Sequence, residues 1–167
     1  MTIEIRDAGR DDLEAVNVLR RQVNDLHVQG RPDIFRPGFG PDLEAHLLEQ
    51  FESDQAGVIV AVADGRIAGF AVVQYICRPQ SAYSLARSFY RVEEFGVDAA
   101  FRRRGIATLL MKYLREDARR LGFNRIELDV WAFNESALAF YTSVGFTTYR
   151  RYMELEIQED CPCEPSM

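Results

Sequence analysis

The stretch that decides the predicted fold runs from residue 92 to residue 110 and reads VEEFGVDAAFRRRGIATLL. Its first part, VEEFGV, is typical of a strand, although it carries two adjacent glutamates. A basic turn that contains a glycine follows, and the apolar positions 107, 110, 111, 114, 118 and 121 then repeat with the spacing of an amphipathic helix. The stretch therefore predicts a strand that passes through a short basic turn into a helix.

The rest of the chain also alternates between segments with the two-residue period of a strand and segments with the 3.6-residue period of a helix. Asp64-Gly65 is a strong hairpin signal between two apolar runs. Strands are predicted at 2–8, on both sides of that turn within 57–77, at 89–97, at 125–131 and, as a closing strand, at 146–157; helices are predicted at 10–30, 42–53, 104–122 and 134–145. This order predicts one α/β domain with a mixed sheet and helices on both faces, followed by a disordered tail at 158–167.

Composition excludes several classes of partner. The 167 residues carry a net charge of −6, which argues against nucleic acid bound by broad electrostatics. No apolar run reaches the roughly 20 residues that a membrane span requires, and residues 1–14 lack a signal-peptide core. The three cysteines do not describe a disulfide framework, so a cytoplasmic location is expected. The acidic balance fits a cationic substrate, but solubility alone also explains it.

The basic turn has the features of a phosphate-binding site. The unpaired N–H groups in the first turn of a helix favour an anion, and Gly105 and Ala107 would let a diphosphate approach the backbone closely. Three consecutive arginines, 102 to 104, add positive charge to an otherwise acidic chain. A solvated basic face with an incidental glycine remains an equally good interpretation, and the turn is not a Walker loop.

The glutamate pair raises a different question. Because side chains alternate along a strand, either Glu93 or Glu94 must point toward the covered face, where an ionised group needs a wet cleft or a cation. An edge position with pairing to Arg87 or Arg91 is the alternative. Gly96 indicates a bulge or a close approach by a ligand, which would free the neighbouring backbone groups to bind amides.

Other candidates are weaker when they are taken alone. Tyr141 occupies a helix position that more often holds a core aromatic, and Asn134 fits the N-cap of that helix. His27 and His46 have no ligand spacing, so no metal site is predicted. No Ser/His/Asp or Cys/His arrangement stands out.

Taken together, these motifs resemble the Gcn5-related N-acetyltransferase (GNAT) superfamily. The acetyl-CoA signature of that family is matched by Arg102-x-x-Gly105-x-Ala107 after a strand, and a second motif is matched by LDVWAFNESALAFYTSVGF at 128–146. The resemblance covers residues 2 to about 157. The Glu-Glu-Phe segment at 93–95 is similar to the Glu-Asp-Phe of polyamine acetyltransferases. Ala replaces a common Pro in the DAAFRRR turn, and Gly96 stands where the family often has a large residue.

The resemblance implies a site and a reaction. It implies a mostly antiparallel mixed sheet whose fourth and fifth strands splay apart. It implies that Glu93 is the base, with Glu94 beside it, and that Tyr141 lies near the thioester sulfur. The residues implied to bind acetyl-CoA are Phe95, Gly96, Val97, Arg102, Arg103, Arg104, Gly105, Ile106, Ala107, Thr108, Asn134, Ala137 and Tyr141.

The expected activity is direct transfer of an acetyl group from acetyl-CoA to a primary amine, without a metal. A small cationic amine is favoured as the acceptor, while a peptide N-terminus stays open; residues 28–39, 78–88 and 149–152 would build the acceptor site. A homodimer is expected by family analogy. The rival interpretations are a non-catalytic acyl-CoA-binding module on the same fold and an interaction domain that uses Phe35 and Phe39.

Overall fold

A computed structural model describes residues 2–157 of the chain. Its strands are β1 (Ile3–Asp7), β2 (Ala56–Ala63), β3 (Arg66–Arg78), β4 (Arg87–Val97) and β5 (Ile126–Leu128), and its helices are α1 (Leu13–Gly30), α2 (Pro41–Glu52), α3 (Ile106–Arg120) and α4 (Glu135–Ser143). The predicted tail at 158–167 lies outside the described residues.

The sheet has five strands in the order β1-β2-β3-β4-β5. The first four strands are antiparallel to their neighbours, and β5 is parallel to β4. The β4–β5 pairing includes only Tyr90 to Val92 of β4, opposite Ile126 to Leu128. Beyond Val92 the two strands separate, so the predicted α/β fold with splayed fourth and fifth strands is confirmed.

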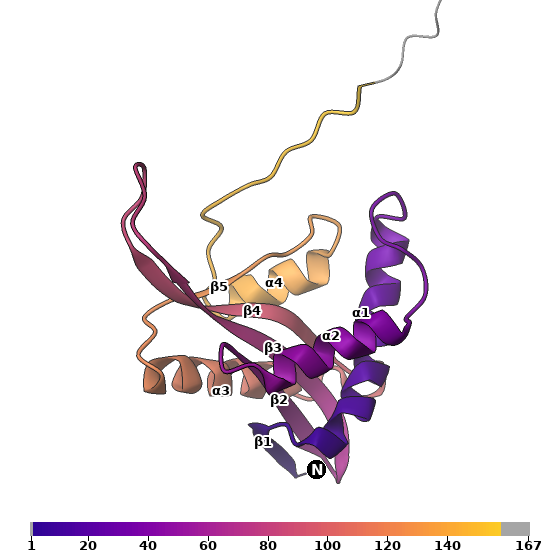
Figure 1. Cartoon of the computed structure of the whole chain (residues 1–167). Coiled ribbons are helices and arrows are strands. Elements are labelled where there is room, and N and C mark those ends of the chain that lie inside the picture. The colour runs from indigo at the N-terminus through magenta and orange to yellow at the C-terminus, as the bar shows by residue number, and fades with distance from the viewer. Residues whose placement is uncertain (1, 158–167) are drawn as a thin grey trace, which may run out of the picture.

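Two apolar clusters cover the two faces of the sheet. On one face, Val16 and Leu19 of α1 and Leu47 of α2 pack on Val60, Phe70 and other residues of β2 and β3. On the other face, α3 contributes Ile106, Leu110, Met111, Leu114 and Ala118, and α4 adds Phe140 and Tyr141. Figure 1 shows these helices on opposite sides of the twisted sheet.

The hairpin predicted at Asp64-Gly65 is confirmed. Both residues have positive φ, 49° and 78°, as a two-residue turn between antiparallel strands requires. The hairpin joins β2 to β3 and fixes the register that places Phe70 and Val72 toward α1 and α2. Among the described residues, no helix is long and apolar enough to span a membrane.

The predicted closing strand is wrong. Residues 146–157 have no regular secondary structure, and Figure 1 shows this segment, in yellow, running away from the sheet as an extended arm. The strand predicted at 125–131 is also shorter, because only Ile126–Leu128 pairs with β4. The alternation at 146–157 is real, but alternation predicts a strand only where an edge is present to pair with it.

Candidate functional site

The basic turn borders a pocket at the N-terminus of α3. The pocket has a volume of about 220 Å³, and its lining consists of Val97, Phe101, Arg102, Arg103, Gly105, Ile106, Ala107, Thr108 and Phe140. Seven of the residues expected to bind acetyl-CoA therefore meet around one hollow, and α4 closes it with the Phe140 ring. Asn134 and Ala137 are not part of this lining.

The turn holds an unusual backbone conformation. Arg103 and Gly105 have φ values of 61° and 80°, in the left-handed region that disfavours most side chains. Gly105 is the N-cap of α3 and has open space around its Cα, with no atom within 4 Å of an added Cβ. The glycine is thus required by its conformation, and the first N–H groups of α3 stay accessible to an anion.

A bulge interrupts β4 at the glutamate pair. Val72 of β3 pairs with Glu94 and Val73 pairs with Val92, so Glu93 is the extra residue. The bulge that was expected near Gly96 lies three residues earlier. An added Cβ at Gly96 would lie 2.7 Å from Phe70 Cε1 and 3.0 Å from Val23 Cγ2, so the packing of α1 against the sheet, and not a ligand, requires this glycine.

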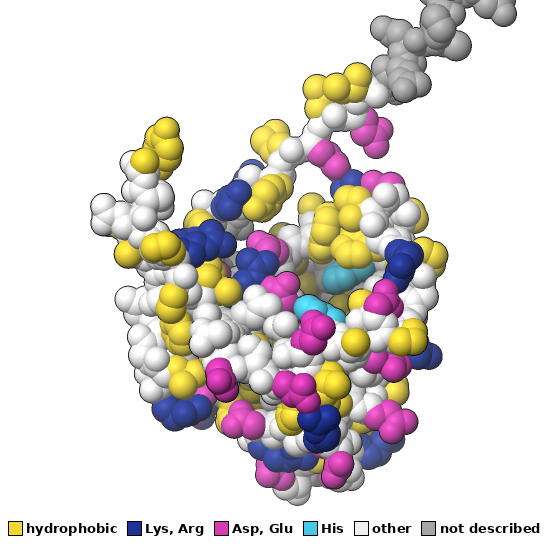
Figure 2. All heavy atoms as spheres, in the orientation of Figure 1, with side chains coloured by type: hydrophobic (Ala, Val, Ile, Leu, Met, Phe, Trp, Pro, Cys, Tyr) yellow, Lys and Arg dark blue, Asp and Glu magenta, His cyan; other side chains and the backbone are white. Residues whose placement is uncertain are grey.

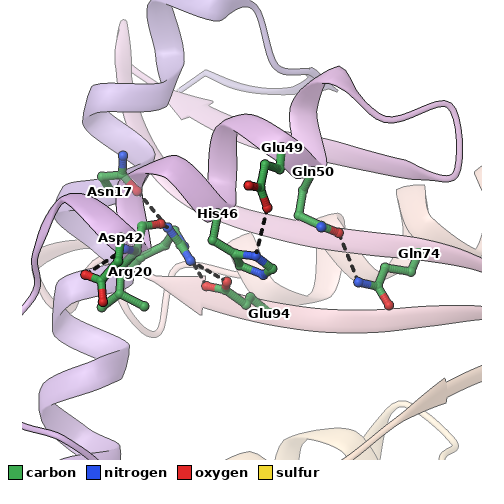
Figure 3. A network of polar contacts seen from close by, with 9 residues as sticks. Asn17, Arg20, Asp42, His46, Glu49, Gln50, Gln74 and Glu94 are labelled. Carbon is green, nitrogen blue, oxygen red and sulfur yellow. Dashed lines mark hydrogen bonds and ion pairs between the residues drawn. The ribbon is translucent and has the colours of Figure 1, made fainter.

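Glu94 points toward α1, where Arg20 holds it. Arg20 Nε and Nη2 each donate to the carboxylate at 2.7 Å, and Arg20 Nη1 donates to Leu43 O at 2.6 Å and to Asn17 Oδ1 at 2.8 Å. The Arg20 side chain is 3% exposed, against 23% for Glu94. Figure 3 shows this network between the two helices and β4. The Arg20–Glu94 pair therefore ties α1, β4 and the start of α2 together.

Replacing Arg20 with methionine should destabilise the fold by about 2 kcal/mol, because Glu94 would lose a bidentate, charge-assisted partner in a mostly buried place. The measurement is urea unfolding of the two proteins followed by circular dichroism. Arg21→Met is the matched control: its guanidinium lies over the Phe39 ring on an exposed helix face, and its loss should change stability by less than about 0.5 kcal/mol. Equal stability of Arg20→Met and the parent would show that the pair does not hold α1 to β4.

Glu93 lies in a different environment. Arg91 Nε donates to Glu93 Oε2 at 2.6 Å, and Arg91 Nη2 donates to Asp129 Oδ2 at 2.7 Å. The Glu93 side chain is 34% exposed, and Asp129 is 69% exposed. The alternative of pairing with Arg91 is thus observed for Glu93, but it leaves the carboxylate accessible at the point where β4 and β5 separate.

Tyr141 packs beside β4 on the α3 and α4 face. Its ring centroid lies 6.1 Å from Phe95 and 5.7 Å from Phe146. Burial raises the pKa of Tyr141 to about 12, so its hydroxyl stays protonated through the physiological range. The structure thus brings Tyr141 next to the β4 segment that β5 leaves unpaired.

Asn134 has a structural contact that the N-cap prediction anticipated. Its Oδ1 accepts hydrogen bonds from Ala137 N and from Ser136 Oγ, each at 3.2 Å. This cap starts α4 and fixes the helix that carries Tyr141.

The sequence analysis missed an aromatic wall at the end of α1. His27 stacks on Phe35 at 4.9 Å and meets Phe133 edge-on at 6.2 Å, and Trp131 lies 5.1 Å from Phe35 and 6.2 Å from Phe133. The last turn of α1 accommodates this wall because a Cβ at Gly30 would overlap the Phe133 ring. The available signal was the helical stripe 16, 20, 23 and 27, which places His27 on the face of α1 that carries Arg20.

Figure 2 shows histidine side chains, in cyan, in and beside a hollow that lies between a hydrophobic patch and acidic side chains. Burial lowers the pKa of His27, and the charge of Glu94 opposes that shift. His27 is thus mostly neutral at pH 7 and contributes an aromatic face with polar edges.

A second hollow, of about 210 Å³, lies at the far end of the sheet beside Asp7, Tyr75, Asp117 and Arg120. Its buried carboxylate is already satisfied, because Tyr90 Oη donates to Asp117 Oδ2 at 2.9 Å and Arg120 pairs with the other oxygen. This hollow is therefore explained as a polar junction between α3 and the sheet.

Comparison with known proteins assigns the family. Residues 23–146 match the model of the Acetyltransferase (GNAT) family. The chain belongs to the GNAT family. The GNAT resemblance of the sequence implied a coenzyme site at two features of this structure: the pocket at the basic turn and the separated strands β4 and β5.

The names of the relatives give different acceptors for the acetyl group. The chain is 33% identical over 91 residues to the [Ribosomal protein bS18]-alanine N-acetyltransferase of Salmonella typhimurium, covering 53% of this chain and 55% of that protein. It is 25% identical over 148 residues to the L-ornithine N5-acetyltransferase NATA1 of Arabidopsis thaliana, covering 83% and 60%. The chain thus spans little more than half the length of these two curated relatives. The tetramutant of the BH1408 protein from Bacillus halodurans has a TM-score of 0.88 at 28% identity over 92% of this chain and 99% of that one.

Proposed function

We propose that this GNAT protein transfers an acetyl group from acetyl-CoA to a primary amine by direct transfer in a ternary complex. The observation that carries the proposal is the meeting of three features at one place: the open N-terminus of α3, the unpaired edge of β4 beyond Val92, and the accessible Glu93 carboxylate. No cysteine is among the residues described at this site, so the attack on the thioester is assigned to the amine itself.

The turn and β4 would hold the two ends of acetyl-CoA. The backbone N–H groups of Ile106, Ala107 and Thr108 would bind the diphosphate, with charge supplied by Arg102 and Arg103. The backbone of Phe95 to Val97, which β5 leaves unpaired, would pair with the amides of the pantetheine arm and polarise the thioester carbonyl.

Glu93 would act as the base. An alkyl ammonium has a pKa near 10 and cannot attack until it loses a proton. Glu93 accepts that proton, directly or through one water, and the amine nitrogen then bonds to the thioester carbon. Glu94 is the weaker candidate because both of its oxygens are engaged by Arg20.

Tyr141 would act as the acid. As the carbon–sulfur bond breaks, a thiolate leaves, and the neutral Tyr141 hydroxyl can donate its proton to the sulfur. The nitrogen of the new amide then releases its second proton, which returns Tyr141 to its neutral form. With a pKa of about 12, the hydroxyl keeps that proton at every pH at which the enzyme would work.

The acceptor class that this site favours is a cationic alkyl amine. Glu93 and Asp129 supply negative charge, and Phe35, Trp131 and His27 supply apolar faces for an alkyl chain or an ammonium. NATA1, which acts on L-ornithine by its name, is consistent with such an acceptor.

Tyr141→Phe should slow transfer about tenfold and leave acetyl-CoA affinity unchanged, because only the proton donor is removed. Steady-state thiol release and isothermal titration measure the two quantities. Tyr113→Phe, which removes a hydroxyl bonded to Asp7 on the other side of α3, is the control and should retain full activity. Loss of acetyl-CoA binding in Tyr141→Phe would assign the residue to cofactor binding instead.

The proposal as a whole is tested by thiol release from acetyl-CoA with a panel of diamines, ornithine, aminoglycosides and peptides with a free N-terminus. Turnover with cationic alkyl amines supports the assignment. Acetyl-CoA binding without turnover of any amine would favour a non-catalytic module.

A further inference from the structure

Three arginines, Arg78, Arg87 and Arg125, lie together where β3 ends and β4 begins, and they have one carboxylate between them. Glu127 of β5 is 8% exposed and accepts a hydrogen bond from Arg87 Nη1 at 2.7 Å, while Arg125 Nη1 lies 3.9 Å from the same oxygen. Tyr149 Oη donates to the other oxygen at 2.8 Å. Figure 2 shows positively charged side chains, in dark blue, gathered at the foot of the hairpin projection. These three residues are called here the arginine cluster.

Arg78 brings a charge to the cluster that no carboxylate of residues 2–157 neutralises in an ion pair. It lies opposite Arg87 in the β3–β4 register, and the two guanidinium carbons lie 5.4 and 4.6 Å from the centroid of the same Phe89 ring. The ring attracts each guanidinium, but it does not cancel the repulsion between them. The cluster therefore keeps an excess of positive charge, in a chain whose net charge is −6. An anion bound between these arginines would relieve the repulsion.

The cluster lies on the same face of the sheet as the proposed base. Arg91 is directly opposite Glu127 in the β4–β5 register, and side chains that are two or four residues apart on a strand share a face. Arg87 therefore shares its face with Arg91, which binds both Glu93 and Asp129. Asp129 continues the alternation of Glu127 just after β5.

The spacing of these residues gives the distance between the two charged regions. Glu127 and Asp129 are two residues apart, which corresponds to roughly 7 Å along a strand. Arg87 and Arg91 are four residues apart, which corresponds to roughly 13 Å. A positive region thus lies about 7–13 Å from the carboxylates that are proposed to receive the ammonium of the acceptor.

The sign of the cluster restricts what the far end of an acceptor can be. A diamine would bring a second ammonium toward the arginines, which would repel it, and a simple alkyl amine would leave them without a partner. A carboxylate fits, because the planar fork of a guanidinium matches it with two parallel hydrogen bonds. Arg78 is exposed, so its donors are accessible to such a group.

We propose that the arginine cluster is a second subsite for the acceptor and binds a carboxylate at the far end of the molecule whose amine is acetylated. The acceptor is then a long-chain zwitterion, with its ammonium at Glu93 and Asp129 and its carboxylate at Arg78 and Arg87. This inference rests on the proposed acetyl transfer and narrows its acceptor from cationic alkyl amines in general to those that also carry a carboxylate.

Matched acceptors test the subsite by steady-state thiol release. ε-Aminocaproate and its neutral amide have the same chain and the same reacting amine, and hexylamine lacks the far group altogether. We expect kcat/KM to be at least about tenfold higher for ε-aminocaproate than for the amide or hexylamine, through a lower KM, because the subsite binds the ground state and the transition state alike. β-Alanine is too short to reach both regions and should not be preferred over β-alaninamide.

The outcomes separate the subsite from the reaction on which it rests. Equal kcat/KM for ε-aminocaproate and its amide, with both acetylated, would overturn the subsite and leave the reaction standing. Acetylation of no amine at all would overturn the proposed reaction, and the subsite would fall with it. A preference of the same size for β-alanine would show a general attraction to anions and would also overturn the subsite.

Arg78→Gln locates the effect in the cluster. This variant should raise the KM for ε-aminocaproate about tenfold and leave the rates with hexylamine unchanged, because it removes only a partner of the carboxylate. Arg21→Gln is the matched control: it removes the same charge from an exposed arginine that lies 5.6 Å over the Phe39 ring, and it should keep the full preference. An unchanged preference in Arg78→Gln, or an equal loss in Arg21→Gln, would contradict the assignment.

Discussion

Replacing Glu93 with glutamine is expected to lower turnover by about 10²- to 10³-fold at pH 7, because the amine acceptor would lose its proton acceptor. The variant should gain activity as the pH rises, since the fraction of free amine increases about tenfold per pH unit up to the pKa of the ammonium near 10. The rate of the parent protein should depend less steeply on pH. Steady-state rates from pH 6.5 to pH 9.5 with a saturating diamine measure both effects.

The control for Glu93→Gln is Asp129→Asn. Both carboxylates accept hydrogen bonds from Arg91, at 2.6 and 2.7 Å, so both substitutions loosen the same guanidinium. Asp129 is also proposed to attract the acceptor, so the two variants are compared at saturating diamine, and only Glu93 is assigned the proton. If Asp129→Asn lowers turnover as much as Glu93→Gln does, and with the same pH dependence, then the orientation of Arg91 accounts for the effect and Glu93 is not the base.

Local patterns were sufficient for most of the fold. The amphipathic helix after the basic turn, the hairpin at Asp64-Gly65 and the strand before that turn each depend on neighbours in sequence, and the structure confirms these elements. The predicted inward stripe of the helix is confirmed only for Leu110, Met111, Leu114 and Ala118, which are buried. Leu121 is 40% exposed beyond the end of α3, and Ile106 rather than Ala107 begins the buried face. The turn pocket could be predicted for the same reason, because all of its lining residues except Phe140 lie between Val97 and Thr108.

The features that were missed depend on residues far apart in sequence. Arg20 and Glu94 are 74 residues apart, so the glutamate pair alone could not reveal its buried partner. The aromatic wall joins the end of α1 to the loop after β5. The helical stripe of α1 places His27 on the face of Arg20, but no spacing in the chain indicates that Trp131 and Phe133 lie beside it.

The closing strand failed for a related reason. Residues 146–157 have the correct alternation, but a strand also needs a partner edge, and alternation does not say on which molecule that edge lies.

Gly105→Glu is expected to weaken acetyl-CoA binding by at least about 100-fold. Gly105 caps α3 with a φ of 80°, so any side chain there adds strain of about 1–2 kcal/mol to the turn. The new carboxylate would also stand at the mouth of the pocket, where the N–H groups of α3 would otherwise meet a diphosphate. Isothermal titration with acetyl-CoA gives the affinity directly. In thermal unfolding, the roughly 2.7 kcal/mol that a ligand adds at 100 times its dissociation constant should fall to about 0.4 kcal/mol or less.

Gly122→Glu separates the charge at the pocket from backbone strain. Gly122 follows the other end of α3 with a φ of 84°, and, like Gly105, it has no atom within 4 Å of an added Cβ. The same substitution therefore imposes a similar conformational cost at the far end of the same helix. We expect Gly122→Glu to lose some stability and to bind acetyl-CoA as the parent does. Equal weakening in the two variants would mean that damage to α3 lowers the affinity, and a Gly105→Glu protein that binds normally would show that the diphosphate does not lie at this turn.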